Sequence, residues 1–461
     1  MHLPARYSRD TQGGIEITNL RIAILVLGIV ASACSPKTLE IADSVERGSP
    51  GDQLPTASEP AGNRESCERR AADLSWTSER SATVAVLSEG GDTSPRVEAV
   101  VYPHPGYDGD PWSQWGQGLV LDDGRYLSAI GDHGGPDGNS YVFEYDPATE
   151  TLTQIIDMLA IVDHTPGDWG FGKIHAQMVR GSCDNVLLTT YWGTRRGIEY
   201  TAGYRGDVLI NIDPKLKTVG TRGVVHPEHG VPSLAATPDG RLLYAEAVDP
   251  LRDDGGAFLV QSAADGTTLF IDDDPSHTGY RAIAVDADGS AFYSIGEGRL
   301  AVYSPESNTR SQLEALIPGD WLRAATEPDS HGTLYGVTRS PEVFFALHPD
   351  GTVRTLTNAL GYTTSVALSP DGAMLYSVPE AHGRSWQLGA PLMAVDTTTG
   401  TQETLVELQP LAEEHLGLRL GGTYNVAIDK SRGTIYVGMN ASDASDDSGF
   451  GEVVLMIVTL P

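Results

Sequence analysis

Side chains that can bind anions or transfer protons recur in this sequence where apolar, strand-like runs begin or end. Lys173 and His175 flank the start of one such run, and Tyr191 directly follows the next, Leu187 to Thr190. A lysine can neutralise a carboxylate, while an imidazole or a phenol can take or donate a proton. We therefore interpret Lys173, His175 and Tyr191 as candidate catalytic residues. A hydrogen-bonded structural role for His175 and rim packing for Tyr191 remain open.

Further polar residues share these positions, and we interpret them as candidate ligand-binding residues. Those at strand starts are His229, Arg281, Arg323, Tyr362, Tyr424 and Asn425, and those after a second strand are His133, Glu246, Glu380 and His382. An arginine can grip a carboxylate with two parallel hydrogen bonds. Pairing of Arg281 or Arg323 with Glu246 or Glu297 is the alternative.

Two of these segments look alike, because Asp132-His133-Gly134 and Glu380-Ala381-His382-Gly383 both combine a carboxylate with an imidazole. Such a pair could perform acid–base chemistry. Loops held by turn hydrogen bonds are the interpretation that we favour.

These candidates are distant in sequence, so a repeated scaffold must bring them together. The repeat consists of an apolar strand, a turn with Asp-Gly or a similar pair, and a second strand. Examples are residues 119–127, 234–244, 282–289, 366–376 and 426–436. Asp-Gly supplies the positive φ of a tight hairpin. A second hairpin follows in most units, with Asp-Pro or a relative ending its first strand, as at residues 143–147 and 210–214.

Two hairpins per unit, recurring every ~40–60 residues, predict an all-β, seven-bladed β-propeller of four-stranded antiparallel blades. The units begin near Trp115, Ile174, Pro232, Tyr280, Leu322, Tyr362 and Tyr424. The last strand, residues 453–458, could pair with the early run 82–87 and close the ring. A β-sandwich or two β domains would be the alternative.

In a propeller, the starts of first strands and the ends of second strands meet on one face, which predicts a polar, partly cationic funnel there. The chain of 461 residues has 31 Lys+Arg against 62 Asp+Glu, a net charge of -31. Such a surface repels nucleic acid and anionic lipids, so we exclude nucleic-acid partners. Cations gathered in a funnel of this acidic protein would focus an anionic ligand toward it.

The N-terminus has the pattern of an export signal. Arg21 precedes an apolar run, residues 22–30, that is too short to span a bilayer and suits a signal peptide. Ala31-Ser32-Ala33-Cys34 resembles the bacterial lipobox, which predicts lipidation of Cys34, and cleavage after Ala33 without lipidation is the alternative. We therefore expect a lipoprotein signal peptide (residues 1–33), a flexible tether (34–78) and the propeller (79–461). The protein would be a monomer in the cell envelope, in contact with membrane only through its lipid.

Two further cysteines, Cys67 and Cys183, could form one disulfide in an exported protein, or remain separate thiols. Neither belongs to a metal-binding cysteine pattern, so we exclude a structural zinc site. The acidic runs 272–274 and 443–447 lack the ligand alternation of a calcium loop, and we interpret them as solvated loops.

The blade pattern, Pro-Asp-Gly followed by Leu-Tyr at residues 238–244 and 370–376 with strands that end in Asp-Pro, resembles a broad group of bacterial propellers. The group includes the gluconolactonase/senescence-marker family, the YVTN-type surface propellers and the propeller-fold polysaccharide lyases. The resemblance covers residues 80–461 and implies the fold, but the chain contains no complete catalytic motif of these families. Resemblance to gluconolactonases would also imply a divalent metal in the funnel, held by Glu246, Glu380 and His175 or His382.

Two functions follow as hypotheses. The first is binding and processing of an anionic saccharide or small carboxylate, by a lyase reaction through Lys173, His175 and Tyr191 or by a metal-assisted lactonase reaction. The alternative is a non-catalytic surface propeller that binds a glycan, a peptide or a partner protein through the same face.

Overall fold

The computed structural model describes residues 74–77, 80–194, 203–251, 256–273 and 282–461. All of them belong to the second of two compact units, residues 61–461. The predicted signal peptide, Cys34, Cys67, Arg281 and most of the predicted tether lie outside the described residues. Within the described part, no helix has both the length and the apolar character needed to cross a membrane.

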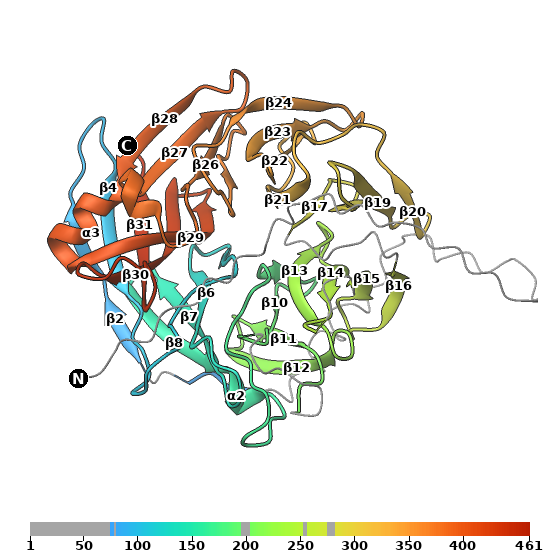
Figure 1. Cartoon of the computed structure of the whole chain (residues 1–461), viewed down its shortest axis with the longest axis horizontal. Helices are drawn as coiled ribbons and strands as arrows, with labels where there is room; N and C mark the ends of the chain where they lie inside the picture. Colours follow the sequence, from blue (N-terminus) through green and yellow to red (C-terminus); the bar gives the residue numbers. More distant parts are fainter. Residues whose placement is uncertain (1–73, 78–79, 195–202, 252–255, 274–281) are drawn as a thin grey trace, which may run out of the picture. The chain divides into compact units, whose positions relative to one another are not determined.

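The described residues form seven antiparallel sheets, arranged around a central axis (Figure 1). Six of the sheets contain four strands in chain order from the inside outward, whereas the seventh runs β29, β30, β31, β4 and β3, and three of the seven sheets have five strands. This arrangement confirms the predicted seven-bladed β-propeller. We number the blades by the chain order of their innermost strands.

Blades 1 to 3 begin at β5, β9 and β13. Blade 1 contains β5 (Leu119–Val120), β6 (Tyr126–Gly131), β7 (Ser140–Asp146), β8 (Thr151–Asp157) and, outermost, β2 (Ser81–Thr83). Blade 2 contains β9 (Val179–Arg180), β10 (Val186–Thr189), β11 (Val208–Asp213), β12 (Thr218–Val224) and, outermost, β1 (Leu74–Ser75). Blade 3 contains β13 (Gly230–Ala236), β14 (Leu242–Val248), β15 (Gly256–Ser262) and β16 (Thr268–Asp272).

Blades 4 to 7 continue the ring. Blade 4 contains β17 (Ile283–Val285), β18 (Ala291–Ser294), β19 (Leu300–Ser304) and β20 (Thr309–Gln312), and blade 5 contains β21 (Trp321–Ala325), β22 (Leu334–Arg339), β23 (Val343–Leu347) and β24 (Val353–Asn358). Blade 6 contains β25 (Ala367–Leu368), β26 (Met374–Ser377), β27 (Pro391–Asp396) and β28 (Gln402–Glu407). Blade 7 contains β29 (Leu418–Asp429), β30 (Thr434–Asp443), β31 (Glu452–Thr459), β4 (Arg96–Val101) and β3 (Ala85–Ser88). The helical segments are α2 (Met158–Ile161), the 3-10 helix η2 (Ser385–Leu388) and α3 (Leu408–Leu416).

The Asp-Gly turns join the first two strands of a blade, as their sequence predicts. In blade 3, Asp239 accepts a hydrogen bond from the backbone N–H of Arg241 at 3.0 Å, and Gly240 has a φ of 67°. A side chain at Gly240 would also collide with the backbone of Gly181 in blade 2, since a Cβ there would lie 2.4 Å from the carbonyl carbon. The glycine is therefore needed both for the turn and for the close approach of two blades.

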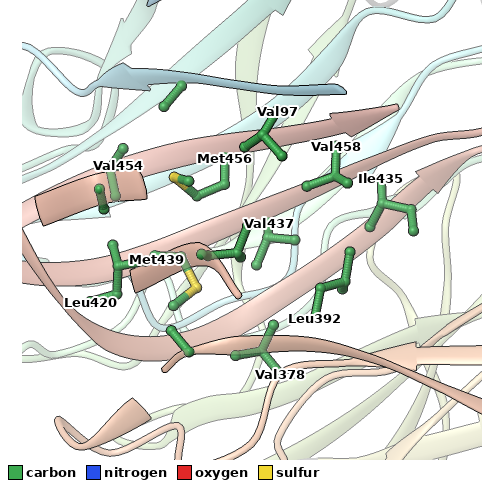
Figure 2. Packing of buried hydrophobic residues seen from close by; sticks show 14 of the residues in the cluster. Val97, Val378, Leu392, Leu420, Ile435, Val437, Met439, Val454, Met456 and Val458 are labelled. Atoms are coloured by element: carbon green, nitrogen blue, oxygen red, sulfur yellow. The ribbon is translucent and has the colours of Figure 1, made fainter. Parts of the chain in front are cut away.

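The hydrophobic core is divided into clusters that lie between neighbouring blades. Within the described residues there are seven clusters, each drawing side chains from two adjacent blades. Figure 2 shows the cluster between blades 6 and 7, where Val378 and Leu392 face Val437 and Met439. Each fully buried side chain of this size contributes roughly 1.5–3 kcal/mol, so packing between the sheets holds the ring together.

The ring closes within blade 7, where the early strand β4 pairs with the C-terminal strand β31. The prediction that an N-terminal strand pairs with residues 453–458 was right, but its choice of residues 82–87 was wrong. That run divides between β2 at the edge of blade 1 and β3, which lies outside β4. The closing strand alternates charged and apolar residues, and its Val97 and Ala99 are buried. Val100, on the other face of the strand, is buried as well, so β4 packs toward both neighbouring blades.

Candidate functional site

Trp115, in the segment that leads into β5, is surrounded by aromatic rings from several blades. The centroid of its ring lies 4.8 Å from that of Tyr424, 5.6 Å from His133, 5.8 Å from His382, 5.9 Å from Phe450 and 6.5 Å from His175. The ammonium of Lys173 lies 4.4 Å from the same centroid. We term these seven residues the Trp115 cluster. They come from the segments at the inner ends of blades 1, 2, 6 and 7, as blade geometry predicts.

The three candidate catalytic residues lie next to one another in blade 2. Lys173 and Tyr191 form an isolated antiparallel bridge, in which the N–H of Tyr191 donates to the carbonyl of Lys173 at 2.9 Å. The imidazole of His175 stacks on the Tyr191 ring with centroids 4.4 Å apart, and its Nδ1 lies 3.1 Å from the carbonyl oxygen of Pro232. All three residues are buried. The structure therefore brings the predicted group together, within a packed stack.

Arg323 extends the cluster toward blade 5. Its Nε donates to the hydroxyl of Tyr362 at 2.9 Å, and its guanidinium carbon lies 5.4 Å from the Tyr362 ring centroid and 5.8 Å from that of Tyr424. The residue is 2% exposed, yet its Nη2 has no hydrogen-bond partner. Arg323 takes part in none of the ion pairs among the described residues. Neither of the predicted alternatives, pairing with Glu246 or with Glu297, is observed there.

His382 and Tyr424 form a polar pair beside Arg323. The Nδ1 of His382 lies 2.9 Å from the hydroxyl of Tyr424, and the proton's position depends on the imidazole tautomer. His382 is exposed, whereas Tyr424 is buried against Trp115. Among the imidazoles of the cluster, that of His382 is consequently the most open to a bound molecule.

His133 contributes an uncharged imidazole to the cluster. Burial, with a further contribution from the nearby charges of Lys173 and His382, lowers the pKa of His133 to about 2. The residue has a φ of 58°, a left-handed conformation that directs it away from the strand that precedes it. A neutral imidazole next to the Lys173 ammonium avoids repulsion between two cations.

The first of the two similar loops is held by hydrogen bonds, as the turn interpretation predicts. The carboxylate of Asp132 accepts hydrogen bonds from the backbone N–H groups of Gly134 at 2.7 Å and Asn139 at 2.9 Å, and from the hydroxyl of Tyr107 at 3.0 Å. Asp132 therefore holds its loop instead of orienting an imidazole. In the second loop, Glu380 lies against Gly361, where a Cβ would be 2.3 Å from the Glu380 carboxylate oxygen.

Three predicted ligand-binding residues, Asn425, His229 and Glu246, do not belong to the Trp115 cluster and contact other residues. Asn425 is fully buried, and its Oδ1 accepts a hydrogen bond from the N–H of Gly118 at 3.0 Å, which links blade 7 to blade 1. His229 lies beside His226 within the loop before β13, with tilted rings whose centroids are 4.3 Å apart. Glu246 is fully buried in blade 3, and burial raises its pKa well above the usual value.

The predicted metal ligands do not form a site among the described residues. No group of three His, Cys, Asp or Glu side chains able to hold an ion occurs in that part of the chain. Burial also raises the pKa of Glu246, which disfavours the ionised carboxylate that a metal ion would need. We therefore derive no chemical step through a metal.

Sequence reasoning missed three residues that the structure brings to the cluster or next to it. Trp115 precedes the first strand of blade 1, where only polar residues were taken as candidates. Phe450 lies in the loop between β30 and β31 and is stacked on Trp115. Arg339 ends β22, the second strand of blade 5, and its guanidinium lies 5.1 Å from the Tyr362 ring centroid. Its position after a second strand is the signal that could have identified it.

No protein-family model and no curated protein sequence matches this chain. Among solved structures it is similar to virginiamycin B lyase from Staphylococcus aureus, in a catalytically inactive variant with quinupristin. That match has 11% identity and a TM-score of 0.52, and covers 79% of this chain and 100% of the lyase. The selenomethionine-substituted form of the same lyase has 12% identity and a TM-score of 0.50, and the match covers 83% of this chain and 100% of that one. An oligogalacturonate lyase in complex with manganese has 11% identity and a TM-score of 0.49, with 83% and 98% covered. The two matches to virginiamycin B lyase agree with the predicted resemblance to bacterial propellers at the level of the fold.

Proposed function

We propose that this protein is an exported, lipid-anchored β-propeller that binds an anionic saccharide or small carboxylate at the Trp115 cluster and cleaves it by elimination. The single observation that carries the proposal is Arg323, a buried guanidinium whose Nη2 has no hydrogen-bond partner. The lyase-type fold is a supporting analogy, and it gives no residue roles.

The cost of burying Arg323 is the first step of the argument. Removing a cation from water is unfavourable by several kcal/mol unless an anion or a full set of hydrogen bonds compensates. Tyr362 provides one hydrogen bond, and the rings of Tyr362 and Tyr424 provide cation–π contacts. A carboxylate would complete this environment by accepting hydrogen bonds from the guanidinium.

The aromatic surroundings define the rest of the ligand. Trp115, Tyr424 and Phe450 lie together as a group of rings, next to the Lys173 ammonium. Sugar rings present C–H faces that pack on aromatic rings, while a carboxylate needs the adjacent cations. An acidic sugar combines both properties, which is why we prefer it to a simple inorganic anion.

The reaction would begin with neutralisation of the substrate carboxylate by Arg323 and Lys173, which makes the proton on the adjacent carbon more acidic. His382, hydrogen-bonded to Tyr424, would accept that proton. The electron pair of the broken C–H bond would form a C=C double bond as the C–O bond to the leaving group breaks. The leaving oxygen would then receive a proton from water or from the protonated imidazole.

A non-catalytic binding role is the second candidate. Its supporting observation is the burial of Lys173, His175 and Tyr191, which are 8%, 4% and 6% exposed. Side chains packed so closely have little access to a reacting bond. In that case the same cluster would hold an anionic glycan or partner without cleaving it.

One assay separates the two candidates. Purified protein is incubated with a panel of uronate oligosaccharides, with and without EDTA, while ultraviolet absorbance follows the unsaturated product. We expect product formation that is lost in His382→Ala, and binding that is lost in Lys173→Met. Lys430→Ala, at the exposed turn between β29 and β30 on the opposite face, is the matched control. Binding without product would support the second candidate, and neither binding nor product across the panel would refute both.

A further inference from the structure

A second hollow lies beside the Trp115 cluster, between the segment that follows β4 and the loop that precedes β31. It has a volume of about 480 Å³ and is lined by His104, Tyr107, Asp108, Trp112 and Glu452, among others. The backbone N–H of Gly451 donates to the carbonyl of Trp112 at 3.2 Å and so joins its two sides. Trp112 and Gly451, which line the hollow, are close in sequence to Trp115 and Phe450, which contact each other in the Trp115 cluster.

The lining of this hollow differs in charge from the Trp115 cluster. It contains the carboxylates of Asp108 and Glu452, and none of its lining residues in the described part of the chain is a lysine or an arginine. Its walls include aromatic rings, since His104 stacks on Trp112 with centroids 4.9 Å apart and Tyr107 lies 5.3 Å from the same ring. Carboxylates combined with aromatic faces favour an organic cation.

The arrangement of His104 and Glu452 further limits which functional group a ligand in this hollow could carry. The Nε2 of His104 is buried and has no hydrogen-bond partner, while the nearest carboxylate oxygen of Glu452 lies 3.8 Å away, beyond hydrogen-bond distance. Burial lowers the pKa of His104 to about 4, so the imidazole is neutral at pH 7. A group with several N–H donors could bond to the imidazole nitrogen and the carboxylate at once.

A primary ammonium meets these requirements better than a metal ion does. The ammonium group carries three hydrogen-bond donors and one positive charge. A sugar ring attached to it could pack on the ring of Tyr107. A metal ion would need several ligating side chains, and no group of three His, Cys, Asp or Glu able to hold one occurs within the described ranges. We propose that this hollow, termed the outer pocket, binds the protonated amine of an amino sugar or a similar ring-bearing amine. It would be a second subsite, on the same face as the Trp115 cluster.

Calorimetric titration with short glucosamine oligomers tests the proposal, and N-acetylated oligomers of equal length serve as the neutral comparison. We expect the acetylated oligomers to bind at least about tenfold more weakly, because acetylation removes the charge. Glu452→Gln should weaken binding of the amine form about tenfold. Glu403→Gln, at an exposed position of β28, controls for general attraction of a cation to this acidic protein.

Two results would overturn the proposal: equal binding of both oligomers, or binding that Glu452→Gln and Glu403→Gln reduce to the same extent. Thermal melting of each variant checks that the fold is retained. The test is separate from that of the proposed function, because Arg323→Met should leave glucosamine binding intact and Glu452→Gln should leave uronate binding intact. Failure of one therefore says nothing against the other.

Discussion

At the scale of single residues, Arg323 gives the clearest support for the proposed binding of an anion. A guanidinium at 2% exposure with one hydrogen bond, from its Nε, reduces stability unless a ligand compensates for its desolvation. A charged side chain at this position therefore lowers the stability of the free protein but favours binding of an anion. A substitution that removes the charge but keeps the volume should separate them.

Arg323→Met is the first prediction. Loss of the buried cation should weaken binding of a uronate ligand about a hundredfold, because the carboxylate would lose its charged partner. The free energy of unfolding should stay the same or increase, since methionine fills similar space without a desolvation cost. Titration calorimetry and thermal unfolding measure the two quantities. A variant that binds uronate as the parent does, or is destabilised by several kcal/mol, would contradict this account.

His133 provides the second prediction, which concerns pH. The folded state lowers the His133 pKa from 6.5 to about 2, so between these values the unfolded chain binds the proton and the folded chain does not. Stability from this group is complete above pH 6.5 and is lost as the pH falls below it, by about 1.4 kcal/mol per pH unit. His133→Asn should remove that slope, and asparagine tolerates the φ of 58°.

Denaturant unfolding between pH 6.5 and pH 4.5 tests this prediction as a difference between variant and parent. Glu246 and Asp207, whose pKa values are raised by burial, contribute a slope of opposite sign, which cancels in the difference. The exposed His415→Asn is the control. Identical pH slopes for the His133 variant and the parent would show that His133 is not buried in its neutral form.

At the scale of elements, side-chain amides join neighbouring blades where strands end. Asn440, near the end of β30, accepts a hydrogen bond from the N–H of Gln114 at 2.7 Å and donates to its carbonyl at 3.0 Å. The amide thus continues the strand pairing between blade 7 and the segment that carries Trp115. Asn425 serves the same purpose through Gly118.

Asn440→Ala is the third prediction. It removes two buried hydrogen bonds and leaves the Gln114 backbone without these partners, at a cost of about 2–4 kcal/mol in the free energy of unfolding. Ligand affinity should also fall, because the segment holding Trp115 loses its attachment. Chemical denaturation measures the first effect and calorimetry the second. The exposed Asn358→Ala on β24 should change stability by less than about 0.5 kcal/mol, and an equal loss in both variants would contradict the assignment.

The strands and turns could be predicted from the sequence where their cause is local, whereas contacts between blades could not. Asp-Gly turns such as Asp239-Gly240 have a local cause, so the blades and the face on which His133, Lys173, Arg323, Tyr362, Tyr424 and His382 lie could be predicted. Contacts between blades have no local signal: the stacking of Phe450 on Trp115 and the pairing of Asn425 with Gly118 depend on segments about 310–340 residues apart in sequence. The same limit explains why Arg96–Val101 was missed as the closing strand.

At the scale of the whole molecule, net charge bears on the proposed ligand, and a disulfide supports the proposed export. The chain carries a net charge of -31, whereas the Trp115 cluster and its neighbour Arg323 contain two cations and no carboxylate. The acidic surface repels an anion elsewhere on the molecule, whereas these two cations would attract it to the cluster. Cys183 is disulfide-bonded, with its partner outside the described residues. Disulfides persist in oxidising compartments, as expected for an exported protein.

Cys34→Ala is the fourth prediction and tests the membrane anchor. The full-length protein, expressed in a bacterial host, should fractionate with membranes and incorporate radiolabelled palmitate. The variant should incorporate none and be released from the membrane fraction, because it lacks the cysteine that would carry the lipid. Its thermal unfolding midpoint should be unchanged, since Cys34 lies outside the residues that form the propeller. Membrane retention of the variant, or a parent protein cleaved after Ala33 without label, would refute lipidation and leave secretion by an ordinary signal peptide.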